Sequence, residues 1–235
     1  MPPIVGSNGG NVLNGTAAAD FITPNGGPDL VFAGAGDDII KATINDGFDA
    51  YDGGTGSDTV DYSALTASVT VQLGVGILGN LPGFAQGSQS ATDLLNSIEN
   101  ASGGQGNDTM TGSGSNNTLD GRSGNDVIAG GRGADTIIGG LGNDTLTGGP
   151  GTDTFVFKPH FGNDRITDFD ADPTGGQDLL DLSGFGITAQ SFASRVTVTD
   201  LGSDLLVTID HDPGQTIRLQ NIANASALTT QDFLL

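Results

Sequence analysis

Aspartate recurs every ninth residue along two stretches of the chain, each time after a glycine-rich turn. Thirteen nine-residue units can be aligned, and their sixth residue is Asp in eleven units and Asn in two. The aspartates are Asp20, Asp29, Asp38, Asp49, Asp58, Asp108, Asp126, Asp135, Asp144, Asp153 and Asp164, and the asparagines are Asn11 and Asn117. Carboxylate and backbone carbonyl oxygens, about six to a site, are the ligands that Ca²⁺ takes, whereas Mg²⁺ requires a stricter octahedron. The spacing therefore indicates repeated calcium chemistry.

The eighth residue of each unit indicates which elements must hold these aspartates. It is apolar in all thirteen units, which occupy residues 6–41 and 44–61 in a first block and 103–156 and 159–167 in a second. These residues are Leu13, Ile22, Val31, Ile40, Tyr51, Val60, Met110, Leu119, Ile128, Ile137, Leu146, Phe155 and Ile166. Because successive side chains of a strand point to opposite faces, a three-residue strand turns only its central residue inward. One apolar residue in nine therefore suffices for a core, provided that the strands stack.

The turns between these strands determine the architecture. The fourth residue is Gly in eleven units, and glycine adopts the left-handed dihedrals that a tight turn requires. Two turns and two strands complete a coil of 18 residues, so turns that are 18 residues apart lie side by side and their aspartates meet. We predict an all-β fold, a parallel β-roll (a right-handed β-solenoid with two short strands per 18-residue coil), closed by a C-terminal β-rich cap.

Two of the most regular units, residues 103–110 and 139–146, share the pattern Gly-Gly-x-Gly-Asn-Asp-Thr-apolar. They resemble the RTX, or hemolysin-type, calcium-binding repeat. The resemblance implies that ions bind between turns on the same edge of the roll. Carried over unit by unit, it implies sites between Asp108 and Asp126, Asp126 and Asp144, and Asp135 and Asp153, with Asp164 in the last turn. The turn glycines that it implies are Gly103, Gly106, Gly121, Gly124, Gly130, Gly133, Gly139, Gly142, Gly148 and Gly151.

Other turns are expected to bind calcium less well. Asn117 pairs a neutral amide with Asp135, and Ser113 and Ser115 replace turn glycines there, so we expect this site to be loose or empty. The implied pairs of the first block include a degenerate turn or cross the inserted residues Ala42 and Thr43; they are Asn11 with Asp29, Asp20 with Asp38, Asp29 with Asp49, and Asp38 with Asp58. In all we expect about five to eight Ca²⁺ per chain.

The composition favours cations and excludes several classes of partner. The 28 acidic and 7 basic residues give a net charge of -21, whose self-repulsion opposes compaction until cations offset it. Nucleic acid is excluded because clustered Lys and Arg are lacking, and membrane insertion because no apolar run reaches about 20 residues. Without cysteine, neither disulfides nor thiolate metal sites can form. A metal bound by oxygen ligands could provide the stabilising cross-link instead.

The sequence offers no catalytic constellation. The only histidines are His160 and His211, and neither HExxH nor GxSxG occurs, which excludes a zinc protease and a serine lipase. Carboxylates are abundant, but the repeat explains them as metal ligands. We therefore predict a module that is not an enzyme.

The repeats divide the chain into four parts: a first β-roll block at 1–61, a spacer packed on the roll at 62–102, a second and regular block at 103–167, and a cap with a secretion signal at 168–235. The cap is expected to contain strands within 178–183, 196–198, 205–209 and 216–219. The N-terminus lacks the basic and apolar regions of a signal peptide. The last four residues, an acid and three apolar residues, resemble the end of a C-terminal signal for type I secretion. We therefore expect an extracellular protein that is exported by the type I secretion machinery.

Together these features predict a secreted, calcium-binding RTX module that folds cooperatively as several Ca²⁺ bind outside the cell. Two alternatives stay open at this point. One is an accessory module of an extracellular enzyme, such as an alginate epimerase or a protease, that binds polysaccharide or assists folding. The other is a structural protein of a surface layer or biofilm that associates with copies of itself.

Overall fold

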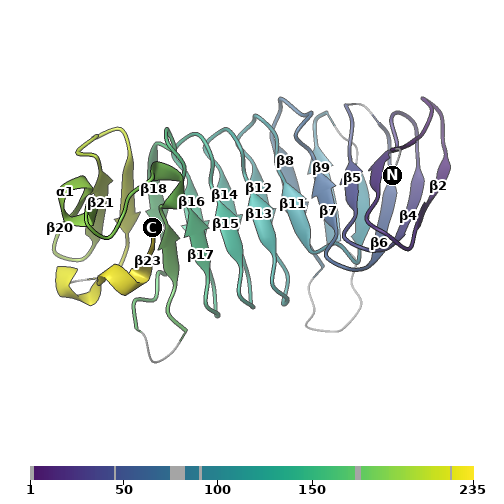
Figure 1. Ribbon diagram of the computed structural model, residues 1–235. Coiled ribbons are helices and arrows are strands. Elements are labelled where there is room, and N and C mark those ends of the chain that lie inside the picture. The colour runs from purple at the N-terminus through teal and green to yellow at the C-terminus, as the bar shows by residue number, and fades with distance from the viewer. Residues whose placement is uncertain (1–2, 45, 75–82, 90–91, 173–175, 223) are drawn as a thin grey trace.

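Two sheets of short strands run along the molecule and form a roll (Figure 1). The computed structural model describes residues 3–44, 46–74, 83–89, 92–172, 176–222 and 224–235. Within these residues, one sheet contains ten strands that all pair in parallel. In their order across the sheet they are β1 (Ile4–Val5), β3 (Phe21–Thr23), β5 (Ile39–Lys41), β7 (Thr59–Asp61), β11 (Asn100–Ser102), β13 (Thr118–Asp120), β15 (Thr136–Ile138), β17 (Thr154–Val156), β19 (Leu179–Asp181) and β23 (Phe233–Leu234).

The second sheet has thirteen strands among the same described residues, and it is parallel except in two places. In their order across the sheet they are β2 (Val12–Thr16), β4 (Leu30–Ala35), β6 (Ala50–Thr55), β10 (Thr92–Asn96), β9 (Gly83–Gly87), β8 (Val69–Gln72), β12 (Thr109–Thr111), β14 (Val127–Ala129), β16 (Thr145–Thr147), β18 (Asn163–Ile166), β22 (Thr216–Leu219), β21 (Leu205–Ile209) and β20 (Val196–Asp200). Antiparallel pairs occur around β9 and in the final hairpins β20–β21–β22. The predicted parallel β-roll is confirmed.

The nine-residue period sets both the register and the core. Strands pair with strands one coil away, as in Thr118↔Thr136 and Val127↔Thr145. The central residue of each repeat strand points inward, and twelve of the thirteen eighth-position residues are at most 1% exposed. Leu13 is half-buried, because β2 is the first strand of its sheet and has a neighbour on one side only.

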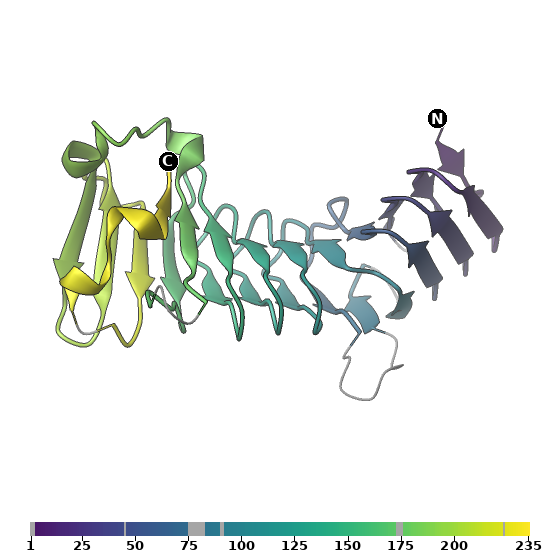
Figure 2. The same cartoon turned by 60° about the horizontal axis from the view of Figure 1, so that its bottom comes forward.

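The residues between the two blocks contribute strands to both sheets. β10 pairs with β6, and β11 lies between β7 and β13, so the ten-stranded sheet continues without interruption from one block to the other. β8 pairs with β12, and β9 joins β8 to β10 in antiparallel fashion. Figure 2 shows that the stack changes direction at these strands. Residues 75–82 and 90–91 of the predicted spacer lie outside the described residues.

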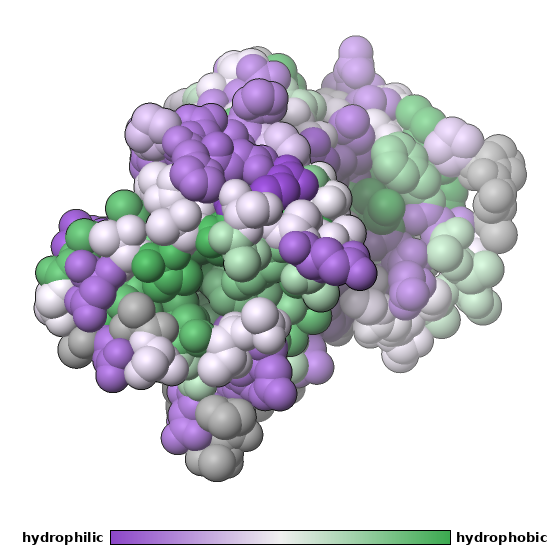
Figure 3. All heavy atoms as spheres, turned by 60° about the vertical axis from the view of Figure 1, so that its left-hand side comes forward, coloured by the Kyte–Doolittle hydropathy of each residue, from purple (hydrophilic) through white to green (hydrophobic). Residues whose placement is uncertain are grey.

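A cap covers the C-terminal end of the roll. It contains the hairpins β20–β21–β22, the helix α1 (Phe192–Arg195), and the 3₁₀ turns η1 (Ser183–Phe185), η2 (Ala225–Ala227) and η3 (Thr230–Asp232). Its half-buried apolar residues include Phe192, Val198 and Leu228, and Figure 3 shows apolar side chains gathered on this end of the molecule. The structure describes no helix that is both long and apolar enough to cross a membrane.

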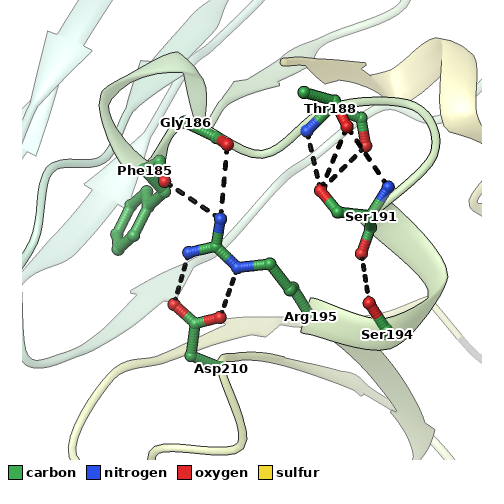
Figure 4. Close-up of polar contacts among 7 residues, drawn as sticks. All are labelled: Phe185, Gly186, Thr188, Ser191, Ser194, Arg195 and Asp210. Carbon is green, nitrogen blue, oxygen red and sulfur yellow. Dashed lines mark hydrogen bonds and ion pairs between the residues drawn. The ribbon is translucent and has the colours of Figure 1, made fainter.

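Arg195 hydrogen-bonds to two other segments of the cap (Figure 4). Its guanidinium donates from Nε and Nη2 to the two carboxylate oxygens of Asp210, at 2.6 and 2.7 Å. Nη1 donates to the carbonyl oxygens of Phe185 and Gly186. Thr188, Ser191 and Ser194 hydrogen-bond in sequence just before α1 ends. The helix is therefore anchored to the loop before it and to the hairpin after it.

Candidate calcium-binding turns

The turns of the roll form two rows, and each row carries a ladder of acidic side chains. Edge A is the row of turns before the strands of the ten-stranded sheet, and edge B is the row before the strands of the other sheet. Within the second block, edge A carries Asn117, Asp135 and Asp153, and edge B carries Asp108, Asp126, Asp144 and Asp164. All seven side chains are at most 3% exposed. Turns 18 residues apart therefore lie side by side, as predicted from the period.

Hydrogen bonds hold each ladder in register. In the second block, one oxygen of every ladder aspartate except Asp108 accepts the N–H of the sixth-position residue one coil earlier. Asp108 N–H donates to Asp126 and Asp126 N–H to Asp144, at 2.7 and 2.8 Å. Asp135 N–H donates in the same way to Asp153, at 2.8 Å. The three pairs implied by the resemblance are thus brought together by the fold.

The other carboxylate oxygen is left without a partner in most of these turns. It is buried and accepts no hydrogen bond in Asp126, Asp135, Asp144, Asp153 and Asp164. A buried, unpaired carboxylate oxygen carries a large desolvation cost, and in native proteins such a group is paired or binds a metal. Asp108 differs, because its second oxygen accepts the N–H of Gly104 at 2.7 Å.

The turn glycines leave the space that these oxygens face. A Cβ added to Gly121 would lie 2.3 Å from Asp126 Oδ2 and 2.7 Å from the carbonyl oxygen of Gly139. A Cβ on Gly130 would likewise lie 2.4 Å from Asp135 Oδ2 and 2.8 Å from the oxygen of Gly148. The first-position glycines of the second block therefore form a cradle in which a carboxylate oxygen and a backbone carbonyl oxygen converge. A Cβ on Gly103, Gly139 or Gly148 would likewise meet the Oδ2 atom of the aspartate five residues later.

The fourth-position glycines let neighbouring turns stack closely. Gly124 has φ +128°, and Gly142 has φ +139°. A Cβ on Gly142 would lie 1.7 Å from the carbonyl oxygen of Gly124, which in turn stacks on Gly106. Gly151 approaches Gly133 in the same manner on the other edge. Any side chain at these positions would force adjacent coils apart.

Burial makes these carboxyls poor acids in the absence of a cation. Desolvation raises the pKa of Asp135 and Asp144 to about 6, of Asp126 to about 7 and of Asp164 to about 8. The backbone N–H donors lower these values, and for Asp126 the charges of Asp144 and Asp108 raise the pKa further. A bound Ca²⁺ would supply the positive charge that favours the deprotonated form.

The donor set fits calcium. Among the described residues, no three Asp, Glu or His side chains form a group that could hold an ion. Adjacent turns with Asp at the sixth position instead offer a pair of aspartates together with backbone carbonyl oxygens, and such an all-oxygen set suits the flexible coordination of Ca²⁺. The residues that would hold the ions are the aspartates with an unpartnered oxygen and the glycines that form the cradle.

The first block repeats this arrangement with changes. Asp20, Asp29, Asp38 and Asp58 each keep a buried oxygen without a partner. The inserted residues Ala42 and Thr43 do not break the ladder, because Asp29 N–H donates to Asp49 and Asp38 N–H to Asp58, at 2.7 and 2.8 Å. The pairs Asn11 with Asp29 and Asp20 with Asp38 also meet, each at 2.7 Å.

Tyrosines occupy two carboxylate oxygens on edge B of the first half. The Tyr51 hydroxyl donates to Asp49 Oδ2 at 2.6 Å. The Tyr62 hydroxyl donates to Asp93 Oδ2 at 2.9 Å. Desolvation raises the pKa of Asp49 to about 6 and that of Asp93 to about 8. Asp46 adds a further fully buried carboxylate with one unpartnered oxygen.

The repeat pattern alone misses several members of the ladders. Asp93 accepts from Asp49 N–H on edge B, at 3.3 Å. Glu99 accepts from Asp58 N–H and Asp178 accepts from Asp153 N–H on edge A, at 3.0 and 2.9 Å. Each of these acids stands two residues before a buried apolar residue, namely Leu95, Ala101 or Leu180. That acid-x-apolar triplet is the signal that survives where the turn glycines are lost.

Three segments of the chain match a known family of repeats. Residues 5–40, 97–128 and 120–155 match the family model of the RTX calcium-binding nonapeptide repeat. No curated protein matches the chain. Among solved structures, the AlgE6R3 subunit of the Azotobacter vinelandii mannuronan C5-epimerase is 28% identical over 55% of this chain and 78% of its own, with a TM-score of 0.44.

Two further solved structures are similar to the chain. The AlgE6R2 subunit of the same epimerase is 28% identical over 57% of this chain and 90% of its own, with a TM-score of 0.43. The extracellular lipase LipA of Serratia marcescens is 21% identical, with a TM-score of 0.43. That match covers 94% of this chain and 39% of the lipase chain.

The fold and its two ladders define a class, the repeat-built parallel β-roll with oxygen-rich turns. The matched residues lie in both blocks and include the ladder aspartates from Asp20 to Asp38 and from Asp108 to Asp153. The chain therefore carries RTX calcium-binding nonapeptide repeats within residues 5–40 and 97–155.

Proposed function

We propose that this chain is a secreted, non-catalytic calcium module that folds as several Ca²⁺ bind to its turns. The observation that carries the proposal is the set of buried carboxylate oxygens without a hydrogen-bond partner in the second block. They are stacked, desolvated and of like charge, so the fold is unfavourable at neutral pH until cations enter. Because the ligands converge only after folding, the free energy of ion binding becomes free energy of folding.

Cooperativity follows from the repeat. Each site needs two adjacent coils, so one bound ion orders the turns that the next ion requires. About seven Ca²⁺ with dissociation constants of about 10⁻⁴ to 10⁻³ M, the range of extracellular modules, would leave the chain unfolded inside the cell and folded outside.

Far-UV circular dichroism with a chelator and with millimolar calcium tests the coupling. We expect a β signal that develops sigmoidally with calcium, and little change with the same concentration of Mg²⁺. Calorimetry of the same titration should give about five to eight ions. Identical spectra with chelator and with calcium would contradict the proposal.

Export of the chain by type I machinery through its C-terminal residues belongs to the same proposal. Phe233 and Leu234 form strand β23 beside β19, and Asp232 is fully buried. A signal in these residues would be free only while the chain is unfolded, which agrees with folding after export. Coexpression with a type I exporter should place the protein in the medium, and replacing residues 232–235 with serine should retain it in the cell.

A second candidate is calcium-dependent self-association, which the outer surface of the first block favours. Val12, Leu30, Ala50 and Leu94 lie in register across one sheet face. Val12 is 64% exposed. Leu30, Ala50 and Leu94 line a groove of about 310 Å³ on this face. An apolar row of this kind on an acidic protein is typical of an interaction surface. Light scattering with and without calcium tests this candidate.

A separate observation supports the alternative that the chain is an accessory module of an extracellular enzyme. Asp120, Arg122 and Lys158 line a groove of about 260 Å³ on the outer side of the ten-stranded sheet. It gathers two of the chain's seven basic residues beside the exposed Leu141. Binding of a polyuronate that is lost in Arg122→Gln/Lys158→Gln would support a polysaccharide-binding role.

A further inference from the structure

Two turns of the roll carry a sixth-position asparagine whose side-chain oxygen and nitrogen are both hydrogen-bonded. They are the turns with Asn at the sixth position, and both have Ser at the second: Ser7 with Asn11, and Ser113 with Asn117. In each, the side-chain oxygen of Asn accepts from the backbone N–H and the hydroxyl of its serine, at 2.6 and 3.1 Å for Asn117 and 3.2 and 3.0 Å for Asn11. The same pair of residues thus makes the same contacts in both blocks.

The amide nitrogens of these asparagines also have partners. Asn117 Nδ2 donates to the carbonyl oxygen of Glu99 at 2.6 Å. Asn11 Nδ2 donates to Asp29 Oδ1 at 2.7 Å and to the backbone oxygens of Ser7 and Gly9. Asn11 Nδ2 thus meets three oxygens, as a cation in such a turn would, and Asn117 Nδ2 meets one.

The contrast with neighbouring turns is direct. On edge A, Asp135 and Asp153 follow Asn117 in the next two coils, and each leaves one buried oxygen unpartnered. Asn117 is equally buried, at 3% exposure, yet its oxygen and its nitrogen are both satisfied. A satisfied neutral amide needs no counter-charge, whereas a buried carboxylate does.

We infer that the side-chain amides of Asn11 and Asn117 take the place of calcium ions, so that these two turns close without metal. The inference rests on the proposed calcium function and deepens it, because it assigns which turns of the ladder stay empty. Serine at the second position is part of the device, since it fixes the amide oxygen and leaves the NH₂ group facing the carbonyl oxygens.

The positions of these two turns in the roll determine where a row of calcium sites would end. Asn11 lies in the terminal coil, where a site would have a neighbour on one side only. Asn117 lies at the junction of the two blocks, and on edge B the corresponding position is Val69, whose N–H donates to Asp108. Both ladders are therefore interrupted at the junction, and calcium would fill two separate arrays, each cooperative within itself.

The test is the number of ions bound at saturation, measured by calorimetry and by elemental analysis of the dialysed protein. Ser113→Gly/Asn117→Asp restores the regular turn, and we expect it to bind one ion more than the wild type. Gln105→Glu makes the same change from amide to carboxylate on an exposed turn side chain and should add none. Asn117→Ala should leave the count unchanged.

The outcomes separate this inference from the function on which it rests. A loss of one ion in Asn117→Ala, or no gain in Ser113→Gly/Asn117→Asp, would overturn the inference while calcium binding by the wild type stands. A wild type that binds no calcium would overturn the proposed function, and this inference with it. A gain of one ion together with a single merged binding transition would support both the empty turn and its role as a break between arrays.

Discussion

The two repeat blocks share a period but leave their carboxylates in different surroundings. In the second block, the units from 103 to 156 bury one apolar residue each, and every ladder aspartate except Asp108 keeps an unpartnered oxygen. In the first block, Tyr51 occupies an oxygen of Asp49, and the following residues add Tyr62, Leu65 and Val69 to the core. Asp49 and Asp93 therefore have tyrosine partners at oxygens that stay unpartnered in most other turns of both blocks.

Their outer surfaces differ as well. The seventh residue of each unit starts a strand and points outward. In the second block it is Thr in five of the six units from 103 to 156, with Val127 as the exception. In the first block, Val12, Phe21, Leu30 and Ile39 hold that position and are 37–64% exposed. The outward strand positions are therefore mostly polar in the second block and mostly apolar in the first.

Removal of calcium should produce the largest difference in stability between the two blocks. Because the units from 103 to 156 bury no apolar residue beyond their central ones, we expect the amides of residues 103–156 to lose nearly all protection in chelator. Residues 20–73 should keep part of theirs, since more apolar area is buried there. Hydrogen exchange followed by mass spectrometry measures both regions in one sample. Equal loss in the two regions would contradict the comparison.

A methyl group in the cradle should be the most damaging single change. In Gly121→Ala, the added Cβ would meet Asp126 Oδ2 at 2.3 Å and the Gly139 oxygen at 2.7 Å. We expect a loss of about 2 to 3 kcal/mol of stability in calcium and at least one fewer bound ion. Gly114→Ala is the matched control, because nothing lies within 4 Å of a Cβ there. Thermal melts and calorimetry with calcium should distinguish the two variants.

Acid should weaken calcium binding in the second block. The ligands must be deprotonated, and desolvation raises the pKa of Asp126 to about 7 and of Asp164 to about 8. Calcium affinity should therefore fall as the pH is lowered from 8 to 5. Without calcium the sign reverses: these pKa values exceed the ordinary 3.8, so the metal-free fold is most stable below about pH 4 and loses stability as the pH rises towards 8. Titrations and melts at pH 5 and pH 8 check both directions, and a pH-independent affinity would argue against buried carboxylate ligands.

Exchange of outward residues should have the smallest effect on stability. Leu30→Thr in the first block and Thr109→Leu in the second change exposed strand positions, so each should alter the free energy of unfolding by no more than about 0.5 kcal/mol. If the first block is the adhesive surface, Leu30→Thr should reduce association in calcium while Thr109→Leu leaves it near the wild-type level. Light scattering gives the answer, and equal association of both variants would remove the surface from consideration.

The sequence predicts the regular parts of this molecule because one rule repeats there. An apolar residue at every ninth place predicts burial, and Met110, Leu119 and Ile128 are fully or almost fully buried. An Asp two residues earlier predicts the ladders, including the pairs that cross the insertion at Ala42 and Thr43. The ions themselves stay a prediction.

The irregular parts were not predictable from the period. Asp93 and Glu99 join the ladders without the glycine turn that marks the other members, and β9 reverses direction between β8 and β10. The hydroxyl of Tyr62 reaches Asp93, which lies 31 residues further along the chain. Such contacts depend on how neighbouring coils stack, which a repeat count does not contain.

The stacking of one carboxylate per coil also makes each edge of the roll resemble a charged polymer. Parallel strands lie about 4.8 Å apart, so an edge such as Asp108 to Asp164 sets charges in a row at that interval. A row of like charges gathers small cations along its whole length, and a multivalent ion must displace them before it can enter. Sodium should therefore compete with calcium. The salinity of the surroundings would then set the calcium concentration at which the roll folds.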